Sequence, residues 1–395
     1  MIGRMIDRMA DTSLELGRGA GPLRGVKVVE LAGIGPGPHA CMTLADLGAD
    51  VIRIEKPGGV MFGSGRHDVL TRGRPSVALD LKHPDAIRAV LDLVEGADVL
   101  VEGMRPGAAE RLGLGPDDCR ARNPALVYGR MTGWGQDGPW AQAAGHDLNY
   151  LALTGVLHGL GQDHSRPHFP SNLLGDFGGG STYLVIGVLA ALLEARASGQ
   201  GQVVDAAIVD GTAHLNAIGA TLAAVGVQPE RRRSGLLDGG APFYDLYETA
   251  DGEHVTVAAL EPQFYDDLLD RLGLADRAPD RDDPANLEEL RGLLTETFKQ
   301  RTQAEWAEVF DGSDACVTPV LPPSEAVGHP HLAARETYVE IDGVTQPAPA
   351  PRFSRTRSVV SMPPGGPGAH TRAALTAWGA DDVDALIESG AAVQA

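Results

Sequence analysis

The sequence predicts an α/β fold built on a parallel β-sheet with helices on both of its faces. From Val26 onward, short and nearly continuous apolar runs alternate with helical stretches, which is typical of strands buried between two helical layers. The length of 395 residues exceeds what one compact core usually holds, so we expect two domains.

The first half of the chain carries the repeated strand–helix pattern. Helices are expected between the strands, over Pro38–Leu47 and Pro84–Glu95. Farther along, Gly178-Gly179-Gly180 opens an apolar helix that continues to about Ala195, and a second helix is expected over Ala206–Ala224. The predicted strands are Val26–Leu31, Asp50–Glu55, Ser76–Leu81, Asp98–Glu102 and Leu126–Met131.

The second half has a different character and predicts a smaller α+β domain. Phe243–Leu260 has the pattern of a β-hairpin that turns at Asp251-Gly252. Thr302 and Glu305 have the spacing of a capping box. The amphipathic helices expected here are Ala285–Gln300 and Gln303–Phe310.

The last part of the chain begins with a connection. Gln346–Gly368 is rich in proline, glycine and serine, and a terminal helix is expected over Thr371–Ser389. The predicted organisation is an N-terminal extension (1–20), a large domain (21–224), a small domain (225–335) and a C-terminal segment (336–395).

Composition excludes some classes of function. The formal charge of −20 argues against nucleic acid as the main partner, because phosphate backbones bind to basic surfaces. The three cysteines, Cys41, Cys119 and Cys316, are widely spaced and form no metal-ligand pattern, so we expect neither a disulfide framework nor a zinc site. This use of cysteine is typical of a cytoplasmic protein, which we expect here. The longest apolar run, Leu184–Leu193, is half a membrane span, and the first twenty residues lack a signal-peptide pattern.

Two tempting motifs fail on inspection. Gly33–Pro38 follows the first strand, where a dinucleotide-binding turn would lie, but Pro38 replaces the last glycine of that pattern. Proline instead suits the first turn of a helix. Asp176-Phe177-Gly178 spells the kinase metal-binding tripeptide without the catalytic loop that should accompany it, and no GxSxG elbow is present.

Two short segments carry candidate chemistry. His146 is a candidate acid or base, because histidine is the side chain that changes charge between pH 5 and 8, and the carboxylate of Asp147 is next to it in the sequence. Asp176 comes just before the glycine-rich helix start, where free N–H groups could stabilise a developing oxyanion. The residues alone leave two interpretations of each group open. His146 is either an acid/base or a structural histidine, and Asp176 is either an acid/base or only a helix N-cap.

Long motifs in a fixed order give a more specific indication. From Gly21 the chain reads VVELAGIGPGPHA and DLGADVIRIEKP, followed by LDLK, EGMRPG, MTGWGQDGP, GHDLNY, NLLGDFGGG, DGGAPFYDLYE and EPQFYD. Over about Gly21 to Arg355 this resembles the α-methylacyl-CoA racemases, close to their bacterial members, within the class III CoA-transferase superfamily. The resemblance implies a Rossmann-like large domain, completed by the C-terminal segment, a small domain, and an interlocked homodimer.

The resemblance also implies a two-base mechanism without metal or separate cofactor, CoA being part of the substrate. The resemblance implies that His146 takes the α-proton of one 2-methylacyl-CoA enantiomer and that Asp176 takes the α-proton of the other. Both directions would pass through an enolate intermediate. Glu261 of EPQFYD is expected near the histidine, and Asp147 is expected to help fix the same ring. The implied setting is branched-chain fatty acid or sterol side-chain breakdown.

The CoA site is implied by the same resemblance. Arg111 has an alternative interpretation as an exposed helix cation, and Arg231–Arg233 are interpreted as a solvated loop. The expected CoA-binding residues are Lys56, Leu79, Leu81, Lys82, Arg105, Arg111, Gly145 and Tyr150.

Two rival functions remain. A CoA transferase of the same superfamily would use Asp176 as a nucleophile on a thioester and form a mixed anhydride. A CoA-binding protein without catalysis is the second rival, and intact His146, Asp176 and Glu261 argue against it. The combination of the GHD histidine with EPQFYD favours the racemase.

Overall fold

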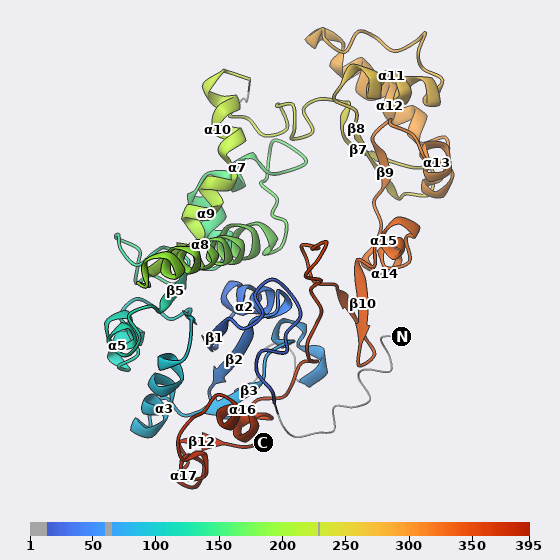
Figure 1. Ribbon diagram of the computed structural model, residues 1–395. Coiled ribbons are helices and arrows are strands. Elements are labelled where there is room, and N and C mark those ends of the chain that lie inside the picture. Colours follow the sequence, from blue (N-terminus) through green and yellow to red (C-terminus); the bar gives the residue numbers. More distant parts are fainter. Residues whose placement is uncertain (1–13, 60–64, 228–229) are drawn as a thin grey trace. The chain divides into compact units, whose positions relative to one another are not determined.

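The computed structural model describes residues 14–59, 65–227 and 230–395 (Figure 1). These residues form two compact units. Unit 1 comprises residues up to Leu153, Ser171–Leu215 and Ala334–Ala395, and unit 2 comprises Thr154–Pro170 and Asn216–Ala333. Residues 154–170 and 216–224 thus group with unit 2, whereas the sequence analysis placed them in the large domain.

Unit 1 is built on a sheet of seven strands within the described residues, in the order β12-β3-β2-β1-β4-β5-β6. β1 to β6 run parallel, and the alternation predicted from the first half of the chain is confirmed. The strands are β1 (Lys27–Leu31), β2 (Asp50–Glu55), β3 (Ser76–Leu79), β4 (Val99–Glu102), β5 (Val127–Thr132), β6 (Val203–Ala207) and β12 (Ala392–Val393).

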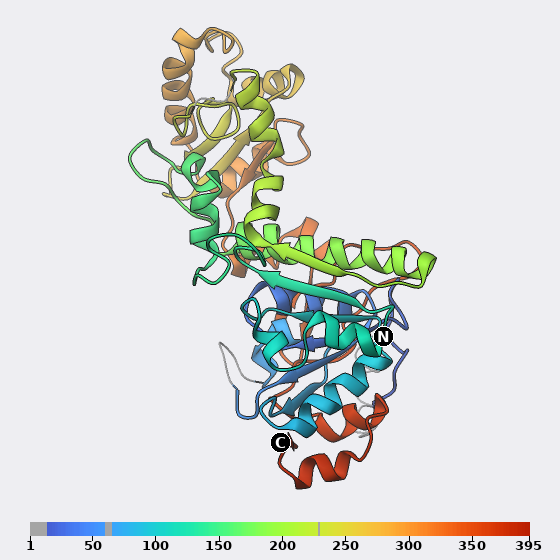
Figure 2. The ribbon, with the colours of Figure 1, turned by 90° about the vertical axis from the view of Figure 1, so that its left-hand side faces the viewer.

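Successive residues of β1 enter different cores, as expected for a strand covered on both faces. Val29 and Leu31 join a core with helices α3 (Pro84–Glu95), α5 (Pro116–Arg122), α16 (Thr371–Ala377) and α17 (Val383–Glu388). Val28 joins the other core, with helices α2 (Pro36–Asp46) and α8 (Thr182–Ser198). Figures 1 and 2 show these two helical layers on opposite sides of the sheet.

Three sequence-based predictions of helices are wrong in detail. The helix expected from Ala206 is preceded by β6 and is split into α9 (Ile208–Leu215) and α10 (Ala217–Ala224). The segment Leu173–Ser181 forms a π-helix, η3, before α8 begins, so Gly178–Gly180 lie inside a helix and do not begin one. The terminal helix is two helices, because the chain turns between α16 and α17 at Gly379, whose φ is +79°.

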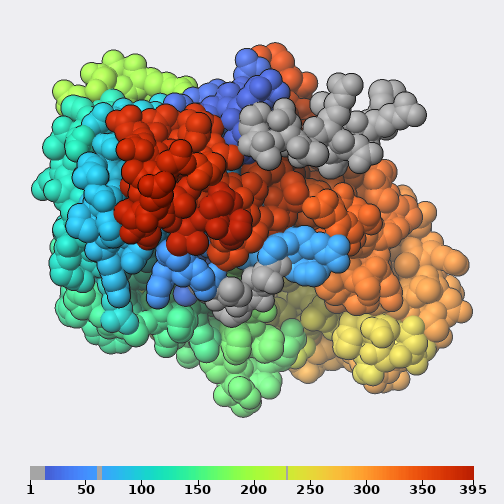
Figure 3. Space-filling view, turned by 90° about the horizontal axis from the view of Figure 1, so that it is seen from below, coloured from blue at the N-terminus to red at the C-terminus, as the bar shows by residue number. Residues whose placement is uncertain are grey.

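The C-terminal segment completes the sheet of unit 1. β12 pairs antiparallel with β3, and Thr371 Oγ1 accepts a hydrogen bond from Ala78 N at 3.1 Å. His370 Nδ1 accepts a hydrogen bond from Ser76 N at 3.2 Å. In Figure 3 this segment, in red, lies on the surface beside the cyan residues of α3, with which α16 and α17 share a core.

Unit 2 contains the predicted hairpin, β7 (Tyr244–Glu248) and β8 (His254–Ala258), to which β9 (Val317–Pro319) adds antiparallel. Thr302 and Glu305 form the predicted capping box, because each side chain bonds to the other residue's backbone N–H. Helix α11 (Pro262–Leu272) was not predicted. The predicted helices are α12 (Leu287–Phe298) and α13 (Gln303–Phe310).

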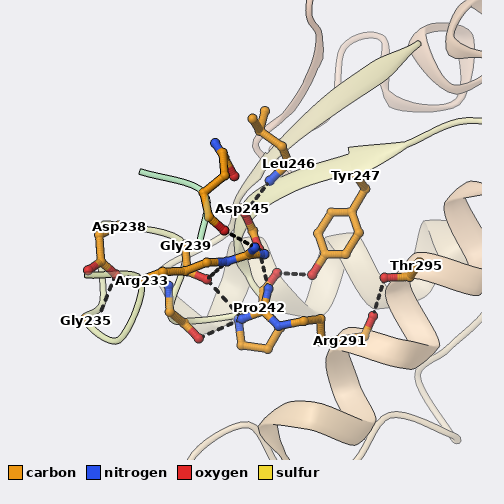
Figure 4. A network of polar contacts seen from close by, with 12 residues as sticks. Arg233, Gly235, Asp238, Gly239, Pro242, Asp245, Leu246, Tyr247, Arg291 and Thr295 are labelled. Carbon is orange, nitrogen blue, oxygen red and sulfur yellow. Dashed lines mark hydrogen bonds and ion pairs between the residues drawn. The ribbon is translucent and has the colours of Figure 1, made fainter. Parts of the chain in front are cut away.

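The interpretation of Arg231–Arg233 as a solvated loop is wrong for its last two residues. Arg232 is buried and donates to the backbone carbonyls of His158 and His164. Arg233 Nη2 donates to Asp245 Oδ2 at 2.7 Å, and Arg291 donates to the same oxygen (Figure 4). A buried carboxylate with two guanidinium partners therefore fixes this loop on β7.

The remaining elements are short. They are α4 (Ala108–Arg111), α6 (Asp147–Leu153), α7 (Val156–Gly159), α14 (Pro323–Ala326), α15 (Pro330–Ala334), β10 (Tyr338–Ile341), β11 (Val344–Pro347), and the 3₁₀ turns η1 (Gly65–His67), η2 (Val69–Thr71) and η4 (Pro284–Asn286).

Candidate active site

A cavity of about 680 Å³ lies in unit 1 at the carboxyl ends of the parallel strands. Its walls come from the segments that follow β1, β2, β4 and β5. The connections of β1 and β4 leave the sheet in opposite directions, which makes their ends the topological switch point where α/β proteins bind ligands. The cavity therefore lies where the fold itself predicts a binding site.

The turn from β1 into α2 shapes one wall. Gly35 has φ +67°, a conformation that favours glycine, and Pro36 occupies the first helical position. Pro38 lies in the first turn of α2, as predicted. Residues Gly33–Pro38 line the cavity, so the amino end of α2 borders it.

His146 lies on the cavity wall and is exposed. It precedes α6, and its backbone N–H donates to Asn149 Oδ1 at 3.1 Å. Behind it, Gly145 leaves no room for a side chain, because a Cβ atom there would lie 2.8 Å from the Tyr150 ring and 2.9 Å from the Trp134 ring. The two rings meet edge to face at 4.7 Å, so a rigid aromatic wall supports the histidine.

Asp176 lines the same cavity from the π-helix η3. Its carboxylate accepts a hydrogen bond from Asn172 Nδ2 at 3.2 Å. A Cβ atom at Gly35 would lie 3.3 Å from Asp176 Oδ2, so the carboxylate lies close to the amino end of α2. The interpretation of Asp176 as a helix N-cap is wrong, because the residue is inside η3 and not ahead of it.

A π-helix is rare and often occurs at functional sites. Here η3 is held against α2 by the side chains of two of its residues. Ser181 Oγ is 2.6 Å from His39 Nδ1, and the Phe177 ring lies 4.7 Å from the His39 ring. These contacts fix the segment that presents Asp176 to the cavity.

Burial, neighbouring charges and a hydrogen bond all change the pKa of the Asp176 carboxyl group. Burial raises the pKa of its carboxyl above the ordinary aspartate value, and the negative charge of Asp147 raises it further. The hydrogen bond from Asn172 and the nearby His146 lower the same pKa. The net direction is upward, which favours the protonated form as an acid.

Asp147 is buried and bonds to a different partner from the one expected. Its Oδ1 accepts the backbone N–H of Asp176 at 2.7 Å, and its carboxylate also accepts the N–H of Gly175. Among the described residues, the Asp147 carboxylate thus bonds to the backbone of η3, and its expected role in fixing the His146 ring stays a prediction.

The expected CoA residues divide into two groups. Lys56 and Arg105 are exposed cations on the cavity wall, together with Gly145 and Tyr150. Burial and the charges of Asp176 and Asp147 raise the pKa of Tyr150 to about 12. The other expected residues do not line the cavity, and they are Leu79, Leu81, Lys82 and Arg111.

The second group has visible structural roles. Leu79 is fully buried in the core shared with α3, and Leu81 packs against that core. Lys82 is exposed, and its N–H donates to Asp80 Oδ1 at 3.1 Å. Arg111 ends α4 and is exposed, with its guanidinium beside Gly107.

Glu261 belongs to unit 2, where it is the residue before α11 and is exposed. Its expected place near the histidine stays a prediction.

Sequence reasoning missed a set of charged residues at the strand ends. Glu30 is buried and lines the cavity, and its two oxygens accept hydrogen bonds from Arg53 Nη1 at 2.9 Å and Arg74 Nη1 at 2.5 Å. Glu102, at the end of β4, is buried and accepts from Arg130 Nε at 3.0 Å. A charged residue that closes an apolar strand was the available signal, because parallel strands gather such residues at one edge.

Comparison with known proteins shows what this chain is similar to. The model of CoA-transferase family III matches residues 23–371. Alpha-methylacyl-CoA racemase of Mus musculus is 45% identical over 342 residues, covering 86% of this chain and 88% of that protein. The Homo sapiens protein of the same name is 42% identical over 344 residues, with the same coverage of 86% and 88%. The crystal structure of a CAIB/BAIF family protein from Brucella suis has a TM-score of 0.75 and 28% identity, covering 90% of this chain and 98% of that one.

Proposed function

This chain belongs to CoA-transferase family III, and we propose that it is an α-methylacyl-CoA racemase, an isomerase of (2R)- and (2S)-2-methylacyl-CoA thioesters. The observation that carries the proposal is that His146 and Asp176, from segments far apart in the chain, line one cavity. The racemase relatives, at 45% and 42% identity, support the same activity.

The proposed reaction moves one proton between two bases. One of His146 and Asp176 removes the α-proton as the C–H bond breaks, and the electron pair passes to the thioester as an enolate. The other group then donates a proton to the opposite face of the same carbon. The raised pKa of Asp176 suits the donor role, and a positioned acid or base contributes about 10²–10⁴-fold.

The enolate needs stabilisation where its negative charge develops. The amino end of α2 lines the cavity at Gly35–Gly37, and the positive end of a helix dipole favours an anion there. Pro36 and Pro38 carry no backbone N–H, so among the first three residues of α2 only Gly37 has an N–H group to donate.

We assign the CoA phosphates to Lys56 and Arg105, because both cations lie on the cavity wall. Arg111 and the Leu79–Lys82 segment stay secondary candidates. Glu261 as a partner of the histidine rests on the family resemblance alone.

A homodimer is also proposed. The helix of η3 and α8, Leu173–Ser198, is long and apolar enough to cross a membrane by length and composition, yet its buried residues pack on the sheet. Its other face exposes Ile186 and Leu193, at 54% and 70%. A second copy of the chain would cover that apolar face.

A cytoplasmic location is proposed as well. It is supported by the three cysteines, which are all unpaired.

The family name keeps the CoA transferase as the alternative, with Asp176 as the attacking nucleophile. The test offers the protein one enantiomer of a 2-methylacyl-CoA in D₂O without free carboxylic acid. A racemase incorporates deuterium at Cα as the opposite enantiomer appears. A transferase has no acceptor and leaves that hydrogen in place. Absence of exchange, together with CoA transfer to an added acid, overturns the racemase.

A further inference from the structure

The two segments that carry the proposed bases are joined by one carboxylate. Asp147 follows His146 directly and begins α6. Its Oδ1 accepts the N–H of Asp176 at 2.7 Å, and its carboxylate accepts the N–H of Gly175 as well. A single side chain therefore connects the backbone beside one base to the backbone of the other.

The contact is built into the fold at close range. Asp147 is 5% exposed. A Cβ atom at Gly175 would overlap Asp147 Oδ1, so only a residue without a side chain lets the carboxylate reach the peptide. Gly175 has no unusual φ, so this contact is the reason on view for a glycine there.

The second oxygen of Asp147 adds an independent observation. Asp147 Oδ2 is buried and has no hydrogen-bond partner among the described residues. A buried polar atom without a partner costs stability, so a role in holding the backbone does not account for the whole carboxylate. Its charge acts on the nearest ionisable group of the π-helix, which is Asp176.

We propose that Asp147 is a positioning residue for Asp176, holding its backbone at a fixed place relative to His146 and placing a buried carboxylate beside it. The inference rests on the proposed function for its kinetic consequence. A two-base reaction needs both groups at opposite faces of one carbon, and a misplacement of about 1 Å can cost about 10²-fold.

Other groups reach Asp176 from the elements packed against η3. His146 lowers the pKa of Asp176, Asp147 raises it, and Asn172 lowers it by its hydrogen bond. The remaining titratable residues on those elements include His39 on α2, Tyr150 on α6, Tyr183 on α8, Asp210 and His214 on α9, Arg130 on β5 and Asp205 on β6.

The test compares Asp147→Asn with the wild type in the full chain. An asparagine oxygen can still accept the N–H of Asp176, but the charge is gone. The pKa of Asp176 should fall. In the direction in which Asp176 is the base, the acidic limb of kcat/KM for Cα exchange should move down by up to about one pH unit.

The matched control is Asp98→Asn. Asp98 Oδ2 accepts the N–H of Lys27 at 2.8 Å, which is the same kind of contact, and Asp98 does not line the cavity. Asp98→Asn should lose about as much stability as Asp147→Asn, and the acidic limb of its kcat/KM profile should stay at the wild-type pH. A limb that stays at the wild-type pH in Asp147→Asn, or moves up, overturns the proposal.

A second variant covers the case in which Asp147→Asn does not fold. Gly175→Ala pushes the carboxylate away from the peptide without removing its charge, so the limb should again move down and kcat should fall. A carbon-13 NMR titration of the Asp176 carboxyl, assigned by its loss in Asp176→Asn, gives the same comparison without turnover. A wild type that exchanges no α-proton refutes the proposed function, whereas an unshifted titration in the variants refutes this inference.

Discussion

Glu30 and Asp245 are buried carboxylates that are each held by two arginines, whereas Asp147 and Asp176 pair with no arginine among the described residues. Glu30 accepts hydrogen bonds from Arg53 and Arg74, and it is 1% exposed. Asp245 in unit 2 accepts from two arginines in the same way (Figure 4). A carboxylate between two arginines holds both side chains in place, because each guanidinium is bonded to it.

Asp147 and Asp176 have a different environment. Among the described residues, neither forms an ion pair with lysine or arginine, and their hydrogen bonds come from backbone N–H groups and the Asn172 amide. Burial raises the pKa of both carboxyl groups. Glu30 and Asp245 thus hold arginine side chains in place, whereas the environment of Asp176 leaves its carboxyl group able to give and take a proton.

The largest expected effect is at Asp176. Asp176→Asn keeps the shape of the side chain and removes the proton-exchanging group, so racemisation should fall by about 10²–10⁴-fold or more. CoA affinity should stay within a few-fold, because the phosphates are assigned to other residues. Chiral separation of the acyl-CoA products measures the rate. Racemisation within about tenfold of wild type would contradict the two-base assignment.

The arginine-held carboxylate should respond through stability instead. Glu30→Gln leaves Arg74 buried without its ion-pair partner and leaves Arg53 with only Glu55 at 3.8 Å, and loss of one partner of a buried pair costs about 3–5 kcal/mol. Denaturant unfolding measures the change. Glu95→Gln is the control, because the Arg122–Glu95 pair is half exposed and such pairs contribute about 0–1 kcal/mol. Equal losses of unfolding free energy in the two variants would show that the ion pairs of Glu30 stabilise the protein no more than an exposed pair does.

The sequence could predict those helices and strands that follow from a regular pattern of apolar residues. Strand and helix positions in the large sheet follow from the alternation of apolar runs, and α3 was predicted with its observed bounds, Pro84–Glu95. β6 was missed because Val203–Ala207 contains Asp205 and is fully buried only at Ala206 and Ala207, so it lacks the apolar pattern of a central strand. The π-helix was missed because a glycine-rich run normally indicates a turn or a helix start.

Site residues were predictable where a motif names them and not where the contact is tertiary. His146 and Asp176 were predicted from their motifs, and the structure brings both to one cavity. That Asp147 reaches the peptide of Asp176 depends on how α6 packs on η3, which periodicity does not encode. Likewise Leu79 was expected at the ligand but lies in the core.

A smaller effect is expected at the cations. Arg105 lines the cavity, whereas Arg111 does not, so Arg105→Ala should weaken CoA binding by about tenfold or more and reduce its salt dependence. Arg111→Ala should change CoA affinity less. Calorimetric titration with CoA at two salt concentrations measures both. A larger loss in Arg111→Ala would move the phosphate site away from this cavity wall.

The smallest expected effect tests in which direction the hydrogen bond from Asn172 shifts the pKa of Asp176. The Asn172 amide donates to Asp176 Oδ2 at 3.2 Å and thereby favours the ionised form. Asn172→Ala removes that donor, so the pKa of Asp176 should rise. In the direction in which Asp176 is the base, the acidic limb of kcat/KM should move up by less than about one pH unit, because Asn172 is exposed and water can replace part of the bond.

This shift is opposite in sign to the one expected for Asp147→Asn, and the pair of variants is therefore more informative than either alone. General damage to the site would lower kcat in both without moving the limb in opposite directions. Opposite shifts would mean that Asp176 is tuned by one group that opposes its charge and another that favours it. Shifts of the same sign would mean that the limb reports a different group, and His146 would be the first alternative to titrate.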